Sequence, residues 1–226
     1  MKLEAPTLHP PIGTAFDHIL EGFRFARRTT PVFTLLVMLG VVSLMAMPFP
    51  VLMPIFAANI LHGRADTLGL LMGGTGLGAL LGSLTLASKR KIQGLGRWVW
   101  ISGIMFGASL IFFSMSRMLW LSVILLVPAG FGMMTQMGAT NTLLQVMSPD
   151  NLRGRVMSLY SMMLIGVTPI GALLGGALAG KVGAPWTVGI GGAACLASGI
   201  LFARQLPSIR GEARELIRAK GIEIGD

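Results

Sequence analysis

The sequence predicts an all-α membrane protein whose chain crosses the bilayer six times. First, 53% of its 226 residues are hydrophobic and 12% are charged, about half of the charge that soluble domains carry. Second, six stretches contain no Asp, Glu, Lys, Arg or His, and each has the roughly 20 residues that a helix needs to span a bilayer. Third, these stretches lack the polar stripe that a helix of a soluble bundle shows to water.

The expected spans are residues 29–61, 68–88, 98–116, 118–147, 156–180 and 182–203. The connections between them are short, so consecutive helices are expected to be antiparallel neighbours. We divide the chain into a linker (1–28), a transmembrane domain (29–205) and a tail (206–226). The tail carries mixed charge, and we expect it to be helical only in part, over residues 212–220.

The positions of the basic residues predict the orientation in the membrane. If the chain starts in the cytoplasm, fifteen of the 18 Lys and Arg residues lie on that side, and only Arg64, Arg117 and Lys181 lie outside. The positive-inside rule then places both termini in the cytoplasm. The net charge of +9 follows from this topology, so we expect membrane lipid and no nucleic acid as a partner.

The linker contains an amphipathic pattern ahead of the first span. Its apolar residues follow helical spacing and are Ile12, Phe16, Ile19, Leu20 and Phe23, with Arg24, Arg27 and Arg28 after them. This pattern predicts a helix that lies on the inner membrane surface. The alternative is a solvated linker helix.

Two triplets of spans carry matching features, which predicts an inverted repeat. The first and fourth spans are the longest, and we expect proline to interrupt both of them. The second and fifth carry closely spaced glycines, which let helix backbones approach: Gly74, Gly78, Gly82, Gly171, Gly175, Gly176 and Gly180. We expect the third and sixth, which are plainer, to face lipid more. Because three is odd, the second triplet enters from the opposite face, as within each half of major facilitator transporters.

Neutral side chains within the spans are candidates for lining a substrate pathway. They are Met45, Met47, Phe49, Thr75, Gln136, Thr140 and Asn141. Gln136 and Thr140 are four residues apart and share a helix face. Flexible methionines suit a cavity that accepts varied apolar ligands. The alternatives are interhelical hydrogen bonds for the polar groups and core filling for the methionines.

No pattern of catalytic residues is visible. His9, His18 and His62 lie outside the spans, so no Ser–His pair can form within the bilayer. There is no carboxylate pair, metal-ligand cluster or phosphate-binding loop. The single cysteine, Cys195, excludes an internal disulfide. We therefore expect no enzymatic activity, no cofactor and no metal.

Residues 148–160, SPDNLRGRVMSLY, resemble a cytoplasmic loop of the bacterial major facilitator subgroup that exports siderophores and macrolide-type antibiotics, the transmembrane secretion effector type. The segments 141–145, 169–174, 21–25 and 183–186 resemble the same subgroup. The resemblance covers residues 18–207. It implies a multi-pass protein of the bacterial inner membrane that expels a small hydrophobic or amphipathic molecule, siderophore-like or drug-like, by alternating access, with multidrug resistance and antiport as associated activities.

Complete members of that subgroup have twelve spans, and this chain resembles their C-terminal six. We therefore expect a second six-helix half as a partner, whether the chain is a truncation, one part of a split transporter or a half that pairs with itself. The spans contain no Asp, Glu, Lys, Arg or His, so a carboxylate for proton antiport is expected on the other half. The alternative function is a truncated, non-transporting membrane protein that acts as an assembly partner or a remnant.

The resemblance also implies a cytoplasmic gate between two basic loops. In the subgroup, the loop between the second and third spans combines basic residues with an aspartate, which is missing here. The loop before the fifth span keeps a carboxylate beside guanidinium groups, which can pair and separate as helices move. The expected gate residues are Lys89, Arg90, Arg97, Asp150, Arg153 and Arg155. The alternative is that the arginines only follow the positive-inside rule.

Overall fold

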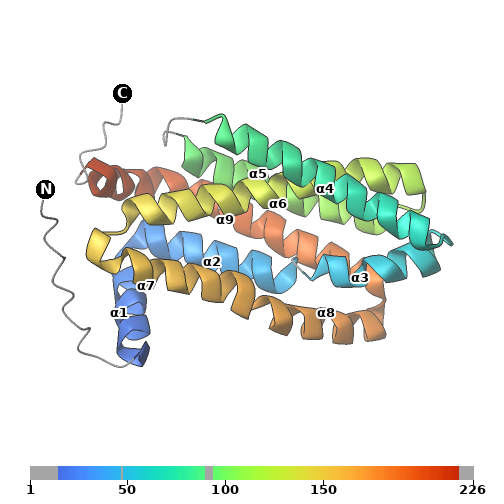
Figure 1. The fold of residues 1–226 in the computed structure, drawn as a ribbon, viewed down its shortest axis with the longest axis horizontal. Coiled ribbons are helices and arrows are strands. Elements are labelled where there is room, and N and C mark those ends of the chain that lie inside the picture. The colour runs from blue at the N-terminus through green and yellow to red at the C-terminus, as the bar shows by residue number, and fades with distance from the viewer. Residues whose placement is uncertain (1–14, 47, 90–93, 219–226) are drawn as a thin grey trace, which may run out of the picture.

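The computed structural model describes residues 15–46, 48–89 and 94–218, and every described element is a helix (Figure 1). The elements are α1 (Ala15–Arg28), α2 (Thr30–Met45), α3 (Phe49–Ile55), the π-helix η1 (Phe56–Ile60), α4 (Ala65–Ala87), α5 (Leu95–Met115), α6 (Leu119–Met147), α7 (Asp150–Ser161), the π-helix η2 (Met162–Gly166), α8 (Thr168–Val182) and α9 (Ala184–Arg218).

Six helical stretches are long and apolar enough to cross a membrane. In chain order these spans, one to six, are Thr30–Ile60, Ala65–Ala87, Leu95–Met115, Leu119–Met147, Asp150–Val182 and Ala184–Ile217. Span one combines α2, α3 and η1, and span five combines α7, η2 and α8. The predicted all-α fold with six spans is confirmed.

Proline interrupts the first and fifth spans, because it has no N–H to donate to the helix. In span one, α3 begins with Pro50 in its first turn and contains Pro54, after which the backbone widens into η1. In span five, η2 is followed by α8, which begins with Pro169 in its first turn. Span four was expected to be interrupted as well, but α6 runs unbroken through Pro128, so that expectation was wrong.

The connections between spans alternate between the two ends of the bundle (Figure 1). Helix α1, the last turn of α4, the first turn of α5, the α6–α7 connection and the end of α9 lie at one end. The connections α3–α4, α5–α6 and α8–α9, which contain Arg64, Arg117 and Gly183, lie at the other. The described ends of the chain therefore lie on the same side, as an even number of crossings requires.

The contacts between spans follow an exchange of the two triplets. Span two packs on span four through α4 and α6, and span one packs on span five through α2, η2 and α8. Span three contacts span four, span one contacts span six, and α5 and α9 of spans three and six pack on each other. Exchanging the triplets converts the first four of these contacts into one another in pairs and the α5–α9 contact into itself, as an inverted repeat requires. The α8–α9 contact between spans five and six has no comparable counterpart between α4 and α5 among the described residues.

The third and sixth spans are not the ones that face outward. In the most apolar window of each span, 50% of α5 is buried, against 22% of α4 and 6% of span five. Glycines explain this burial, because Gly107 of α5 and Gly192 of α9 lie against each other. A Cβ on Gly107 would be 2.6 Å from the Gly192 carbonyl oxygen. Within this chain, spans two and five are therefore the most exposed, whereas we expected spans three and six to face outward more.

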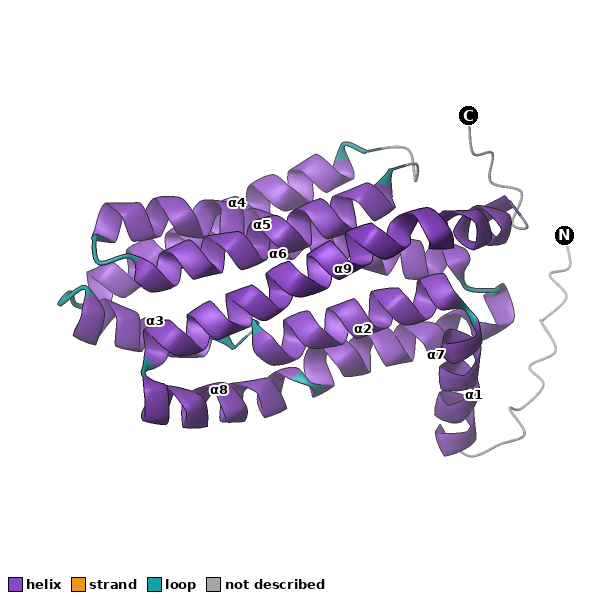
Figure 2. Cartoon of the chain, turned by 180° about the vertical axis from the view of Figure 1, so that it is seen from behind, coloured by secondary structure: helices purple, strands orange, loops and turns teal. Residues whose placement is uncertain are grey.

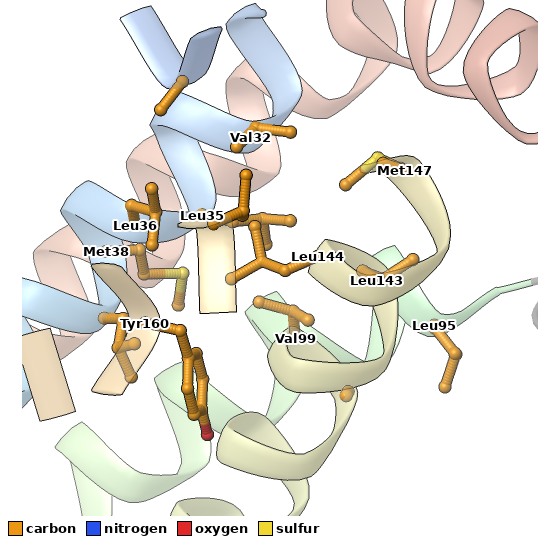
Figure 3. Packing of buried hydrophobic residues seen from close by; sticks show 14 of the residues in the cluster. Val32, Leu35, Leu36, Met38, Leu95, Val99, Leu143, Leu144, Met147 and Tyr160 are labelled. Carbon is orange, nitrogen blue, oxygen red and sulfur yellow. The ribbon is translucent and has the colours of Figure 1, made fainter. Parts of the chain in front are cut away.

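Buried apolar side chains form two clusters, one toward each end of the bundle. In the cluster at the α1 end, Figure 3 shows side chains of α2 and α6 converging, among them Leu35 and Leu144. Helix α9 continues through Pro207 to Arg218 (Figure 2). Residues 206–211, which were expected to lie outside a helix, are therefore helical as well. Ile209 and Ile217 of this extension are buried in the same cluster.

Candidate functional site

Helices α4 and α6 are in backbone-to-backbone contact along three glycines of α4. A Cβ on Gly74 or Gly82 would lie 2.9 or 2.7 Å from a carbonyl oxygen of α6, and one on Gly78 would overlap the Val127 carbonyl. Gly130 of α6 lies equally close to the α4 backbone, because a Cβ there would overlap the Thr75 carbonyl. Backbone atoms are the closest neighbours at these glycines, so the two helices approach closely, and further along the contact the Leu86 side chain of α4 lies against Gly138 of α6.

The glycines of span five behave differently. A Cβ on Gly171 would overlap the Leu44 carbonyl of α2, and one on Gly175 would be at ordinary contact distance, 3.4 Å, from Pro48. Nothing lies within 4 Å of such an atom on Gly176 or Gly180. These two glycines therefore do not make the helix packing expected of them within the described part of the chain.

Four polar side chains are buried without a hydrogen-bond partner among the described residues. They are Ser43 of α2, Ser102 of α5, and Thr135 and Gln136 of α6. Gln136 is 1% exposed, and neither its Oε1 nor its Nε2 is paired. An unpaired buried polar group costs about 1–3 kcal/mol. The sequence indicated Gln136 but not the two serines, because the hydroxyl of a serine in a helix more often donates to a carbonyl of the preceding turn.

The Gln136 amide points toward α5 and α2, whereas its neighbour Thr135 faces α4. A Cβ on Gly103 of α5 would be 3.4 Å from Gln136 Oε1 and 2.6 Å from the methyl carbon of Met38. A Cβ on Gly82 would be 2.9 Å from Thr135 Oγ1. Gln136 therefore lies inside the six-span bundle, behind the α4–α6 contact.

The other expected pathway residues do not line a common surface. Phe49 is buried and packs edge-on against Phe106, with ring centroids 6.1 Å apart, whereas Met45 is exposed. The Thr75 hydroxyl donates to the Leu71 carbonyl at 3.1 Å. Thr140 is buried, and Met47 lies outside the described residues.

Asn141 makes its hydrogen bond within α6. Its Oδ1 accepts a hydrogen bond from Nε2 of Gln145, one turn further along the same helix. The link from α6 to α7 comes from Tyr160, whose hydroxyl donates to the Met137 carbonyl at 3.3 Å. The Asn141 oxygen is therefore paired inside its own helix.

The expected gate residues form three separate contacts. Arg153 Nη2 donates to Asp150 Oδ1 at 2.6 Å, within one turn of α7. The Lys89 ammonium lies 4.5 Å from the centre of the Trp98 ring, across the α4–α5 connection. Arg155 pairs with Glu21 of α1. Arg97 is exposed, and Arg90 lies outside the described residues.

The Glu21–Arg155 pair is part of a close contact between α1 and α7, which we call the α1–α7 clasp (Glu21, Gly22, Arg155). Gly22 packs directly against α7, because a Cβ on it would be 3.0 Å from the Cβ of Arg155 and 3.2 Å from the Arg155 carbonyl oxygen. Glu21 was named only within a segment of family resemblance. Its role as a partner depends on how α1 folds back, which residue spacing does not reveal.

A bundle of six membrane spans, built from two triplets whose contacts exchange, defines a membrane protein of the major facilitator transporter type. More particularly, a family model described as transmembrane secretion effector matches residues 2–220, and the chain belongs to this family. The resemblance in the sequence is thereby confirmed, and the family is one of membrane transport. No curated protein and no solved structure matches the chain.

Proposed function

We propose that this chain is the C-terminal half of an efflux permease. In this proposal a small hydrophobic or amphipathic molecule, siderophore-like or drug-like, crosses the bacterial inner membrane by alternating access. The chain works against a second six-helix half, either another chain or a second copy, and both termini lie in the cytoplasm.

The observation that carries the proposal concerns spans two and five, which exchange under the repeat. Each is held to the bundle on one side by glycine, through Gly78 on α6 and Gly171 on α2, and is exposed elsewhere. A close glycine contact on one side and an exposed face on the other suit helices that rock against their neighbours.

The free faces are also where a second half fits. Large apolar side chains are exposed on both spans, namely Leu77, Leu80 and Leu84 of α4 and Ile165, Leu173 and Leu174 of span five. Lipid or protein can cover such side chains. A complete permease would divide these faces between lipid and the partner half.

Efflux from cells tests the proposal. Cells express the chain alone or together with a six-span partner from its gene neighbourhood, and retention of a siderophore, a macrolide and a fluorescent dye is followed. We expect lower retention of at least one compound in one of these conditions, and restored retention with Gly78→Leu, which obstructs the α4–α6 contact. Gly76→Ala is the matched control, because a Cβ there meets nothing within 4 Å.

Co-purification separates the transporter from the non-transporting alternative. Unchanged retention of every compound in both conditions contradicts the permease. If the chain nevertheless purifies in a stable complex with the other six-span chain, it acts as an assembly partner. If it purifies alone and is readily proteolysed, it is a remnant.

A further inference from the structure

Helix α1 presents a face that mixes apolar and basic side chains and that nothing in the described chain covers. Leu20 and Phe23 are 44% and 41% exposed, and Arg24, Arg27 and Arg28 are exposed as well. Leu20, Arg24 and Arg28 follow each other at four-residue steps, so they share this face. Arg27 lies next to Phe23, with its guanidinium carbon 5.8 Å from the ring centre.

The opposite face of α1 is already occupied. Gly22 and Ala26 on that face are buried, and Glu21, at the edge between the two faces, is paired with Arg155. The clasp therefore fixes which side of α1 points away from the bundle. It also neutralises the acidic residue nearest to the arginines, whereas none of the three arginines forms an ion pair with a described residue.

The direction of α1 completes the geometry. It runs across the end of the bundle instead of along it (Figures 1 and 2). When the spans cross a bilayer, a helix in this position lies along the surface. There, exposed Leu and Phe side chains can enter the headgroup boundary while arginines reach phosphate groups.

We propose that the outward face of α1 docks on anionic phospholipid headgroups of the leaflet at that end of the bundle. The charge is complementary, since basic residues beside a membrane surface each gain about 1 kcal/mol from anionic lipid. Through the clasp, docked lipid also holds α7, which is joined to the rest of span five by η2 and the Pro169 break. Span five is then anchored to the surface on one side of its interruption.

The test uses the full chain in vesicles of phosphatidylcholine alone or with added phosphatidylglycerol. In a Cys195→Ala background, Leu20→Cys carries a fluorophore whose emission shifts to the blue in apolar surroundings. We expect a blue shift with phosphatidylglycerol that high salt weakens. Replacing Arg24, Arg27 or Arg28 by Gln should each lower the ratio of docked to free α1 about fivefold.

Arg210→Gln is the matched control, because it removes an equal charge from an exposed position of α9 at the same end of the bundle. It should leave the shift unchanged. Emission that is the same in both lipids overturns the proposal, as does an equal loss for Arg210→Gln. None of these readings requires efflux, so the result is independent of whether the chain transports.

Discussion

Glu21 of α1 and Arg155 of α7 form the ion pair that fastens the helix before the first span to the start of the fifth. The Glu21 side chain is 52% exposed and that of Arg155 is 26% exposed. Water screens such a pair, so its own contribution to stability is small. Gly22 lies beside it on the α7 backbone and allows the two helices to meet.

Breaking this pair should therefore destabilise the protein only slightly. We expect Glu21→Gln and Arg155→Gln to lower the free energy of unfolding by about 0.2–1 kcal/mol each, with a coupling of similar size in the double variant. Unfolding in detergent by denaturant measures all three. Asp66→Asn, in the first turn of α4 at the other end of the bundle, should show no coupling to Glu21→Gln. Purely additive effects at Glu21 and Arg155 would contradict the clasp.

The α4–α6 contact predicts a large difference between two glycines of one helix. In Gly78→Ala the new methyl overlaps the Val127 carbonyl, so the helices must separate, and we expect a loss of about 1–3 kcal/mol. In Gly76→Ala the methyl meets nothing, and alanine is the better helix former by about 1 kcal/mol. Thermal unfolding of the two purified variants compares them. Equal midpoints would show that the contact is not made.

Sequence reasoning succeeded where a single physical constraint dominates. Lipid tolerates neither charge nor unpaired backbone groups, so the six uncharged stretches predict the six spans closely. Glycine at four-residue spacing predicts close contact, and Gly74, Gly78 and Gly82 lie against α6. Within the described residues, however, Gly176 and Gly180 share the spacing without a neighbour, because spacing marks a face but not what lies opposite.

Sequence reasoning failed where the answer depends on which helices are neighbours. The glycine pattern drew attention to α4 and α8, yet Gly107 and Gly192 bring α5 and α9 together as well. Gly107 stands four residues after Gly103, a spacing that was not singled out in the sequence. The same limit applied to Glu21 and Arg155, which are far apart in the sequence. Ser43 and Ser102 were missed because a serine in a helix gives no sign of whether its hydroxyl is paired.

The arrangement of the connections predicts that Arg64 and Lys89 lie on opposite sides of the membrane. They flank α4, which crosses the bundle once between them. We expect Lys89→Cys to react with a membrane-impermeant thiol reagent only from the cytoplasmic side of sealed vesicles, and Arg64→Cys only from the other. Cys195→Ala provides the background, since that buried cysteine is the only one in the chain. Reaction of both from one side contradicts the six-span topology.

Because the amide of Gln136 is unpaired, we predict that Gln136→Leu keeps or raises stability while it lowers transport. Leucine has a similar size and no polar atoms, so Gln136→Leu removes the cost of burying two unpaired atoms beside Gly103 and Met38. We expect the free energy of unfolding to stay the same or rise by about 1 kcal/mol, because an unpaired buried group costs about 1–3 kcal/mol. Denaturant unfolding measures it, and Gln205→Leu, at an exposed position of α9, should change little.

A destabilisation of Gln136→Leu by more than about 1 kcal/mol would show that the amide has a bonding partner, such as an internal water, and that the polar groups around it form a structural network. If stability is kept but efflux falls, the amide is retained for function at a cost in stability. That combination is typical of polar groups inside transporters, because a bilayer penalises them unless they are used. Efflux of the same compound by Gln136→Leu and Gln205→Leu, at matched protein levels in the membrane, distinguishes the two outcomes.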